Sequence, residues 1–107
     1  MTGSSGILEI TIDHPRLDAA AAPAFREELM GRFEDQPERV LLDLSHVEFI
    51  DSTGLGVLVS MLKRMGANGR IAVVGVAPAV QRLFQITRLD TLFLQCDSTA
   101  AAHDALA

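Results

Sequence analysis

Residues 40–65, VLLDLSHVEFIDSTGLGVLVSMLKRM, decide the fold of this chain. The run over 40–44 is almost continuously apolar, which is typical of a strand buried on both faces of a parallel sheet. After a short polar connection, residues 47–50 lead into a segment with helical spacing, whose apolar side chains are Leu55, Leu58, Leu62 and Met65. Gly66 follows, and glycine is the residue that most often ends a helix in a left-handed conformation. A buried strand followed by a helix predicts an α/β fold.

The segments before this stretch continue the same alternation. A β-rich run over 7–12 predicts a strand, which must end before Pro15 because proline has no amide to donate. A helix is predicted over 19–33, with Pro23 in its first turn and apolar residues at every fourth position, namely Phe25, Leu29 and Phe33. Residues 35–37, Asp-Gln-Pro, break this helix.

The segments after it add two more strands and two more helices. Residues 71–75 predict a buried strand, and Pro78 opens a helix. We expect the inward-facing residues of that helix to be Val80, Leu83, Phe84 and Ile86. Residues 92–94 predict a last short strand, and the final alanine-rich helix begins at the capping pair 97–98 and ends near Leu106.

Length and charge limit the classes of function. With 107 residues, the chain fits one domain, which we place over 7–107 after a flexible tail over 1–6 that is native or left from cloning. Fourteen acidic residues against nine basic ones give a net charge of −5, which disfavours binding to nucleic acid or to anionic lipid. Only five aromatic residues, all Phe, are present to stack on bases.

The lone Cys96 excludes an internal disulfide and any site built from several cysteines. We interpret it as a half-buried bystander. The histidines His14, His46 and His103 do not have the spacing of metal ligands, so we expect surface residues and no metal. Because no apolar run reaches the roughly 18 residues of a spanning helix and no signal peptide is visible, we expect a cytoplasmic protein that does not insert into a membrane.

The segment FIDSTGLG, residues 49–56, has residue types that packing alone does not explain. Ser52 falls at or beside the N-cap of the predicted helix, where amides lack partners and the helix dipole is positive. Gly54 and Gly56 each cost the helix about 1 kcal/mol relative to alanine, and close approach by another backbone would explain them. The simpler alternative is an ordinary cap on a tightly packed helix.

Two catalytic motifs fail here. A hydrolase nucleophile elbow needs glycine where Ile50 stands, and a P-loop needs a Gly-Lys-Ser/Thr triplet that is absent. A triad of Ser52 with His46 and either Asp43 or Asp51 remains as a small serine hydrolase alternative, but the sequence supplies no oxyanion loop beyond the helix start. We therefore expect a protein that is not an enzyme and needs no cofactor.

The stretch over 40–65, together with 78–84 (PAVQRLF) and 86–90 (ITRLD), resembles the STAS domain of bacterial anti-sigma factor antagonists. Residues 16–19, Arg-Leu-Asp-Ala, match an early signature of that family, and the resemblance covers about 7–106. It implies a STAS-like mixed, mostly parallel sheet of about four to five strands with helices packed mainly on one face.

The resemblance also implies a partner-switching function that regulates transcription. In that family the unphosphorylated antagonist binds an anti-sigma factor, which is itself a serine kinase, and so frees the sigma factor. The kinase phosphorylates the antagonist and ends the complex, and a separate phosphatase resets it. The acceptor maps onto Ser52, with Thr53 as the second choice because it offers a neighbouring hydroxyl.

The residues implied in partner binding surround this serine and are Asp18, Asp51, Ser52, Thr53, Gly54, Leu55 and Gly56. A phosphoryl group on Ser52 would add roughly −1.5 to −2 charges beside Asp51. Burying that charge under a partner costs several kcal/mol, so the contact would be lost without refolding. Asp18 has an equally simple interpretation as a helix-entry aspartate.

The chain departs from the family pattern at several positions. Arg88 and Pro15 stand where relatives commonly have glycine, and only residues 1–6 precede the first predicted strand, where relatives tend to carry another. The missing strand would leave an open sheet edge that favours a homodimer. STAS domains also serve as accessory subunits of lipid-transport ATPases, which is the alternative binding function.

Overall fold

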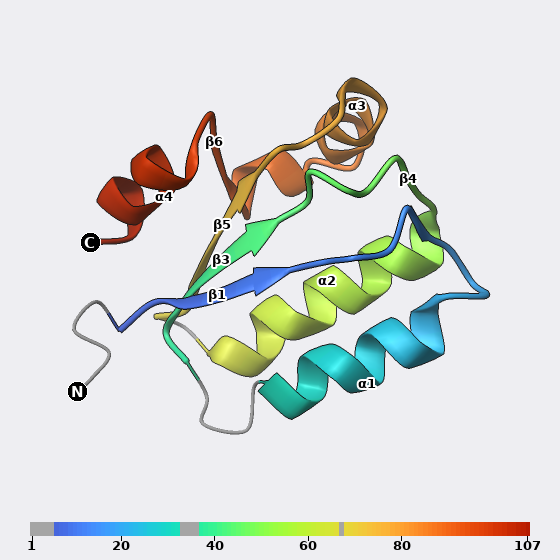
Figure 1. The fold of residues 1–107 in the computed structure, drawn as a ribbon, viewed down its shortest axis with the longest axis horizontal. Coiled ribbons are helices and arrows are strands. Elements are labelled where there is room, and N and C mark those ends of the chain that lie inside the picture. Colours follow the sequence, from blue (N-terminus) through green and yellow to red (C-terminus); the bar gives the residue numbers. More distant parts are fainter. Residues whose placement is uncertain (1–5, 33–36, 67) are drawn as a thin grey trace.

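The computed structural model describes residues 6–32, 37–66 and 68–107. Its centre is a parallel sheet of four strands in the order β1-β3-β5-β6 (Figure 1). Every pairing in this sheet is parallel, as the apolar run at its centre predicts. The strands are β1 (Leu8–Thr11), β3 (Arg39–Asp43), β5 (Arg70–Val74) and β6 (Leu94–Cys96).

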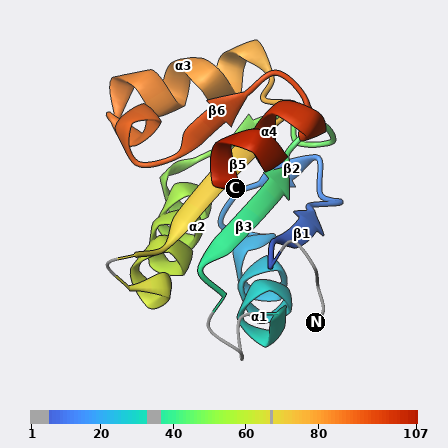
Figure 2. The ribbon, with the colours of Figure 1, turned by 90° about the vertical axis from the view of Figure 1, so that its left-hand side faces the viewer.

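Side chains alternate across this sheet and create two cores of unequal size. On one face Val40, Leu42 and Val73 join the main core with side chains from α1, α2 and α3. On the other face Leu41 and Val74 form a smaller core with Ala102 and Leu106 of α4. The helices are α1 (Ala22–Arg32), α2 (Ser52–Met65), α3 (Pro78–Ile86) and α4 (Thr99–Leu106). Figure 2 shows α4 over the face opposite to α1 and α2, so the expected packing mainly on one face is confirmed.

Two arginines attach α4 to the sheet. Arg39 and Arg70 are register partners at the start of β3 and β5. Arg39 donates to the Leu106 carbonyl at 3.3 Å, and Arg70 donates to the same carbonyl at 2.8 Å and to that of Ala105 at 3.2 Å. The unpaired carbonyls at the end of α4 are therefore satisfied by cations, as the helix dipole favours.

The helix ends follow from capping residues. Asp51 caps α2, Gly66 ends it with φ of 84°, and Ser98 caps α4 by accepting from the Ala101 amide at 3.1 Å. Pro78 occupies the first turn of α3, as predicted. The helix predicted over 19–33 begins later, at Ala22, because the Asp18 carbonyl and carboxylate hold the turn before it.

Two sequence predictions near the C-terminus are wrong. Ile86 does not face inward but is 71% exposed, although Val80 and Phe84 of the same helix are buried. The last strand is not 92–94 but Leu94–Cys96, because 89–91 form a short 3-10 turn, η1. Phe93 is drawn into the core, where its ring stacks on Phe84 with 5.7 Å between centroids.

Some predictions fall on residues that the structure does not describe. These are the tail over 1–5, the helix position Phe33 and the break at 35–36. Within the described part of the chain, β1 is an edge strand of the sheet, and no helix there is long and apolar enough to cross a membrane.

Candidate docking surface around Ser52

The start of α2 is fixed by the Asp51 carboxylate. Its Oδ1 accepts from the Gly54 amide at 3.0 Å, and its Oδ2 accepts from the Ala19 amide at 3.2 Å. One side chain thus caps α2 and ties it to the loop that follows β2 (Arg16–Leu17), a strand that pairs with β4 (Phe49–Ile50). The cap is Asp51 itself, and Ser52 is the first residue of the helix, beside the cap as predicted.

Ser52 and Thr53 are both exposed in the first turn of α2. Because Asp51 already uses both carboxylate oxygens on backbone amides, the Ser52 hydroxyl is not needed to cap the helix. Among the hydrogen bonds of the described residues, none links Ser52 to a histidine, and His46 is an exposed residue. The hydroxyl therefore stands at the surface at the positive end of α2.

The two glycines of the motif have different structural roles. A Cβ at Gly54 would lie 2.1 Å from the Leu17 carbonyl oxygen, so the backbone of β2 occupies the space of a side chain. The predicted close approach at this glycine comes from the domain itself. A Cβ at Gly56 would meet nothing within 4 Å, and the residue is exposed. Packing within the domain does not require glycine at 56.

Gly54 and Leu55 are buried, and Leu55 belongs to the main core. We assign these two residues a structural role. Of the residues implied in docking, the exposed ones are Ser52, Thr53 and Gly56, with Asp18 and Asp51 half-buried at their side.

Asp18 is held by local hydrogen bonds on the same surface. Its Oδ1 accepts from the Ala21 amide at 3.1 Å, and its Oδ2 accepts from Arg16 Nε at 3.2 Å. The hydrogen bond from the Ala21 amide, followed by that from Arg16, lowers the pKa of this carboxyl below its ordinary value. Asp18 thus has the geometry of a helix-entry aspartate. The next residue in the chain, Ala19, donates its amide to Asp51.

Sequence reasoning missed the role of Arg16. Its guanidinium lies over the Phe49 ring, 4.3 Å from the centroid, as well as bonding Asp18. Arg16 and Phe49 are register partners in β2 and β4. Because these strands have only two residues each, the sequence alone does not indicate that the two side chains meet.

A shallow groove of about 520 Å³ runs between α1 and α2 beside these residues. Thr53 and Gly56 line it from α2, and small residues line it from α1 and the preceding loop, namely Ala19, Ala22 and Pro23. We call it the α1–α2 groove. Small side chains and an exposed glycine leave room for another protein to approach the helix start.

A model of the STAS domain family matches residues 1–103. The chain belongs to the STAS domain family. It is 35% identical over 77 residues to proteins named anti-sigma-B factor antagonist from Staphylococcus aureus and Staphylococcus epidermidis, with 71% of each chain covered.

Solved structures have the same fold. An anti-sigma factor antagonist from Mycobacterium paratuberculosis has a TM-score of 0.83 at 29% identity, covering 94% of this chain and 86% of that one. A STAS domain protein from Planctomyces limnophilus has a TM-score of 0.87 at 24% identity, covering 99% and 94%. The STAS-like architecture expected from the sequence is confirmed.

The remaining candidate residues of this STAS domain lie apart from Ser52. His14 Nε2 is 3.8 Å from Glu28 Oε1, and His103 Nε2 is 2.8 Å from Glu9 Oε2 on the opposite side of the sheet. Cys96 is half-buried, as expected. No group of three or more potential metal ligands occurs among the residues that the structure describes.

Proposed function

We propose that this STAS domain is an anti-sigma factor antagonist whose binding is switched off by phosphorylation of Ser52. The antagonist role is supported by the 35% identical relatives, which are named for it. The observation that carries the switch is the placement of Ser52, an exposed hydroxyl at the start of α2 that the helix does not use as its cap. In this proposal the protein acts in the cytoplasm as a binding protein and not as an enzyme.

The proposed partner is an anti-sigma factor with serine kinase activity. In the transfer step the Ser52 Oγ attacks the γ-phosphorus of ATP, the bond to the β-phosphate oxygen breaks, ADP leaves and the hydroxyl proton passes to a base of the kinase. A separate phosphatase then hydrolyses the phosphoserine with water. This chain contributes only the acceptor and the surface around it.

The modification acts through charge at a covered surface. A phosphoserine brings roughly −1.5 to −2 charges at pH 7 and three acceptor oxygens. It would stand next to Asp51 in a chain that already has a net charge of −5. A partner seated on the α1–α2 groove would bury that charge next to the Asp51 carboxylate, which costs several kcal/mol. The positive end of α2 supplies only about 0.3–1 kcal/mol of stabilisation to the phosphate.

Thr53 is the competing acceptor because it is also exposed and lines the α1–α2 groove. The test is phosphorylation by each purified serine-kinase anti-sigma factor of the same genome with ATP, followed by site mapping by mass spectrometry. We expect phosphate on Ser52, loss of incorporation in Ser52→Ala and unchanged incorporation in Thr53→Val. Phosphate on Thr53 or elsewhere contradicts the assignment.

Binding gives the second test of the switch. We expect Ser52→Asp to weaken binding of the anti-sigma factor at least about tenfold, whereas Ser52→Ala, which removes the hydroxyl without adding charge, binds like the wild type. Equal affinity of Ser52→Asp and wild type would refute the charge switch. Specific binding of an ATPase subunit in place of any anti-sigma factor would favour the accessory-subunit alternative.

A further inference from the structure

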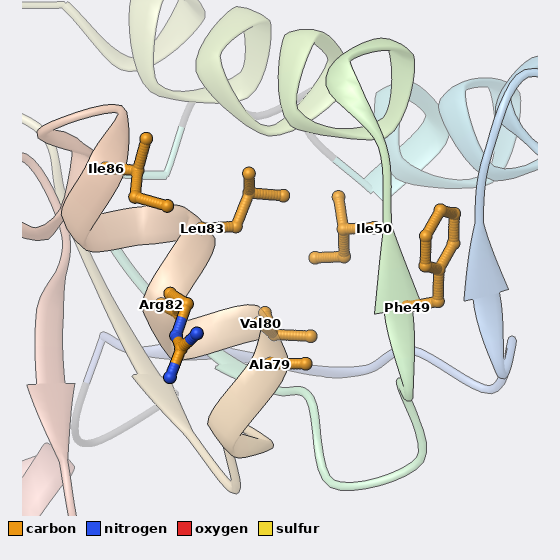
Figure 3. A pocket seen from close by; sticks show the side chains of 7 residues that line it. All are labelled: Phe49, Ile50, Ala79, Val80, Arg82, Leu83 and Ile86. Atoms are coloured by element: carbon orange, nitrogen blue, oxygen red, sulfur yellow. The ribbon is translucent and has the colours of Figure 1, made fainter.

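A second groove lies on the other side of the Ser52 turn, between β4 and α3. It has a volume of about 260 Å³, and we call it the β4–α3 groove. Figure 3 shows Val80 and Leu83 of α3 opposite Ile50 of β4, with the Phe49 ring on the other side of β4. The residues that matter below are Phe49, Ile50, Val80, Leu83 and Ile86, with Arg82 at the rim.

The apolar surface of this groove extends beyond what the domain core needs. Ile86 is 71% exposed and Phe49 is 39% exposed, whereas Val80 and Ile50 behind them are almost fully buried. The apolar stripe of α3 therefore continues from the core out to solvent. Large apolar side chains clustered in one exposed groove are typical of a protein interaction site. A domain that only has to pack its own core seldom exposes such a cluster.

The charges beside the groove are positive, although the chain as a whole is acidic. Arg82 is exposed, and its guanidinium makes no hydrogen bond or ion pair with any described residue. Arg16 lies over the Phe49 ring at 4.3 Å from its centroid, but it is already paired with Asp18 at 3.2 Å. An apolar group accompanied by a carboxylate would complement this combination.

Size and position indicate what occupies the groove. Pockets for small molecules typically measure about 300–1,000 Å³ and enclose 70–90% of the ligand surface. The β4–α3 groove is smaller, and one of its sides is formed by Ile86, which is largely exposed, so it would not enclose a small molecule to that extent. A single large apolar side chain of a protein suits the volume. Phe49 and Ile50 directly precede Asp51 and Ser52, so a partner that covers Ser52 also reaches this groove.

We propose that the β4–α3 groove receives an apolar anchor side chain of the anti-sigma factor, next to a carboxylate of that partner which pairs with Arg82. This inference rests on the proposed function and adds a second contact to it. Thr53 lines the α1–α2 groove and Ile50 lines the β4–α3 groove, so Ser52 lies between the two contacts along the chain. A phosphate on Ser52 would therefore separate the partner from both grooves at the same time.

The test measures affinity for the purified serine-kinase anti-sigma factor by calorimetry. We expect Ile86→Glu to weaken binding at least about tenfold, as truncation or reversal of an interface anchor does. Leu92→Glu is the matched control, because Leu92 is 49% exposed and lies outside the groove. It should bind like the wild type. Both exposed positions should leave the melting temperature nearly unchanged.

Charge reversal tests the carboxylate. Arg82→Glu should weaken binding about tenfold, and Arg64→Glu, at an exposed arginine near the end of α2, should not. Replacing the responsible Asp or Glu of the anti-sigma factor with Arg should restore the affinity of Arg82→Glu.

The two proposals fail in different ways. If Ser52→Asp loses binding while Ile86→Glu and Arg82→Glu bind like the wild type, the groove proposal is overturned and the switch stands. If Leu92→Glu weakens binding as much as Ile86→Glu, the groove has no special role and the proposal is also overturned. If the wild-type protein binds no anti-sigma factor, both proposals fall.

Discussion

Replacing Gly54 with alanine should destabilise the domain, although alanine is the better helix former. The new Cβ would lie 2.1 Å from the Leu17 carbonyl oxygen and 2.9 Å from both the carbonyl carbon and the Cβ of Leu17. The first of these atoms is backbone in β2 and cannot rotate away. That same carbonyl accepts the Asp51 amide at 3.2 Å, so moving it loosens the cap of α2 as well.

The magnitude follows from two opposed effects. Inserting a carbon into a filled space costs about 1–3 kcal/mol, and a rigid backbone obstacle favours the upper end of that range. Alanine returns at most about 1 kcal/mol of helix propensity. We therefore expect a loss of about 2 kcal/mol in the free energy of unfolding. At 4–8 °C per kcal/mol, a domain of this size would melt roughly 8–16 °C lower.

Gly56→Ala provides the matched control, since it makes the same change two residues later in the same helix. Its Cβ would meet nothing within 4 Å, so only the propensity gain of up to about 1 kcal/mol remains. Urea unfolding of the two variants should give opposite shifts from the wild type. If Gly54→Ala is as stable as the wild type, the close approach of β2 to α2 is refuted.

Two further predictions concern loops of this domain. Arg88 has φ of 64°, the only positive φ of a residue other than glycine in the described ranges, so Arg88→Gly should raise the melting temperature by a few degrees, and a lower value in a thermal scan would count against strain at this turn. The pKa of Asp18 is lowered, so its carboxylate stabilises the fold above its unfolded-state pKa of about 3.9, and this contribution is lost as the pH falls through the lower folded-state value. Asp18→Asn should therefore be less stable than the wild type at pH 7, and the difference should shrink as the pH falls below the unfolded-state pKa in urea titrations; a gap that stays constant with pH would be inconsistent with this account.

The central elements could be predicted from the sequence because their periodic patterns are long and strong. The apolar run over 40–44 predicts a strand, and the helical spacing after Ser52 predicts a helix. The structure has β3 and α2 at these places. The sequence places Ser52 at or beside the N-cap, and the structure gives the cap itself to Asp51. Its second bond, to the Ala19 amide, joins residues 32 positions apart and has no local signature.

The errors arise where local pattern is short. The apolar pattern predicts that Ile86 faces inward with Val80, yet at about 100° per residue Ile86 lies about 120° around the helix from Val80, at the margin of the apolar stripe. The apolar residues over 92–94 were interpreted as a strand because such short runs do not distinguish a strand from other buried segments. Stacking of Phe93 on Phe84, a tertiary contact, decided the outcome.

The two glycines illustrate the same limit at the site. Gly54 and Gly56 have equivalent sequence settings, and only the three-dimensional path of β2 separates the one that packing requires from the one that it leaves free. Gly56 has no packing contact within the domain that requires glycine, and it lies on an exposed face beside Thr53. Contact with a partner protein would explain why glycine stands there.

A switch at Ser52 has to change binding without unfolding the protein, and the structure separates these two tasks between neighbouring residues. Asp51 and Gly54 hold the start of α2 through contacts directed into the domain, whereas Ser52 projects from the same turn to the surface. A negative charge at Ser52 also lies at the positive end of the helix, where it gains about 0.3–1 kcal/mol. We therefore expect Ser52→Asp to keep the wild-type melting temperature or to raise it slightly, in contrast to Gly54→Ala. A thermal scan in which Ser52→Asp falls as far as Gly54→Ala would show that Ser52 supports the fold, and a loss of binding in that variant would then report unfolding and not a switch.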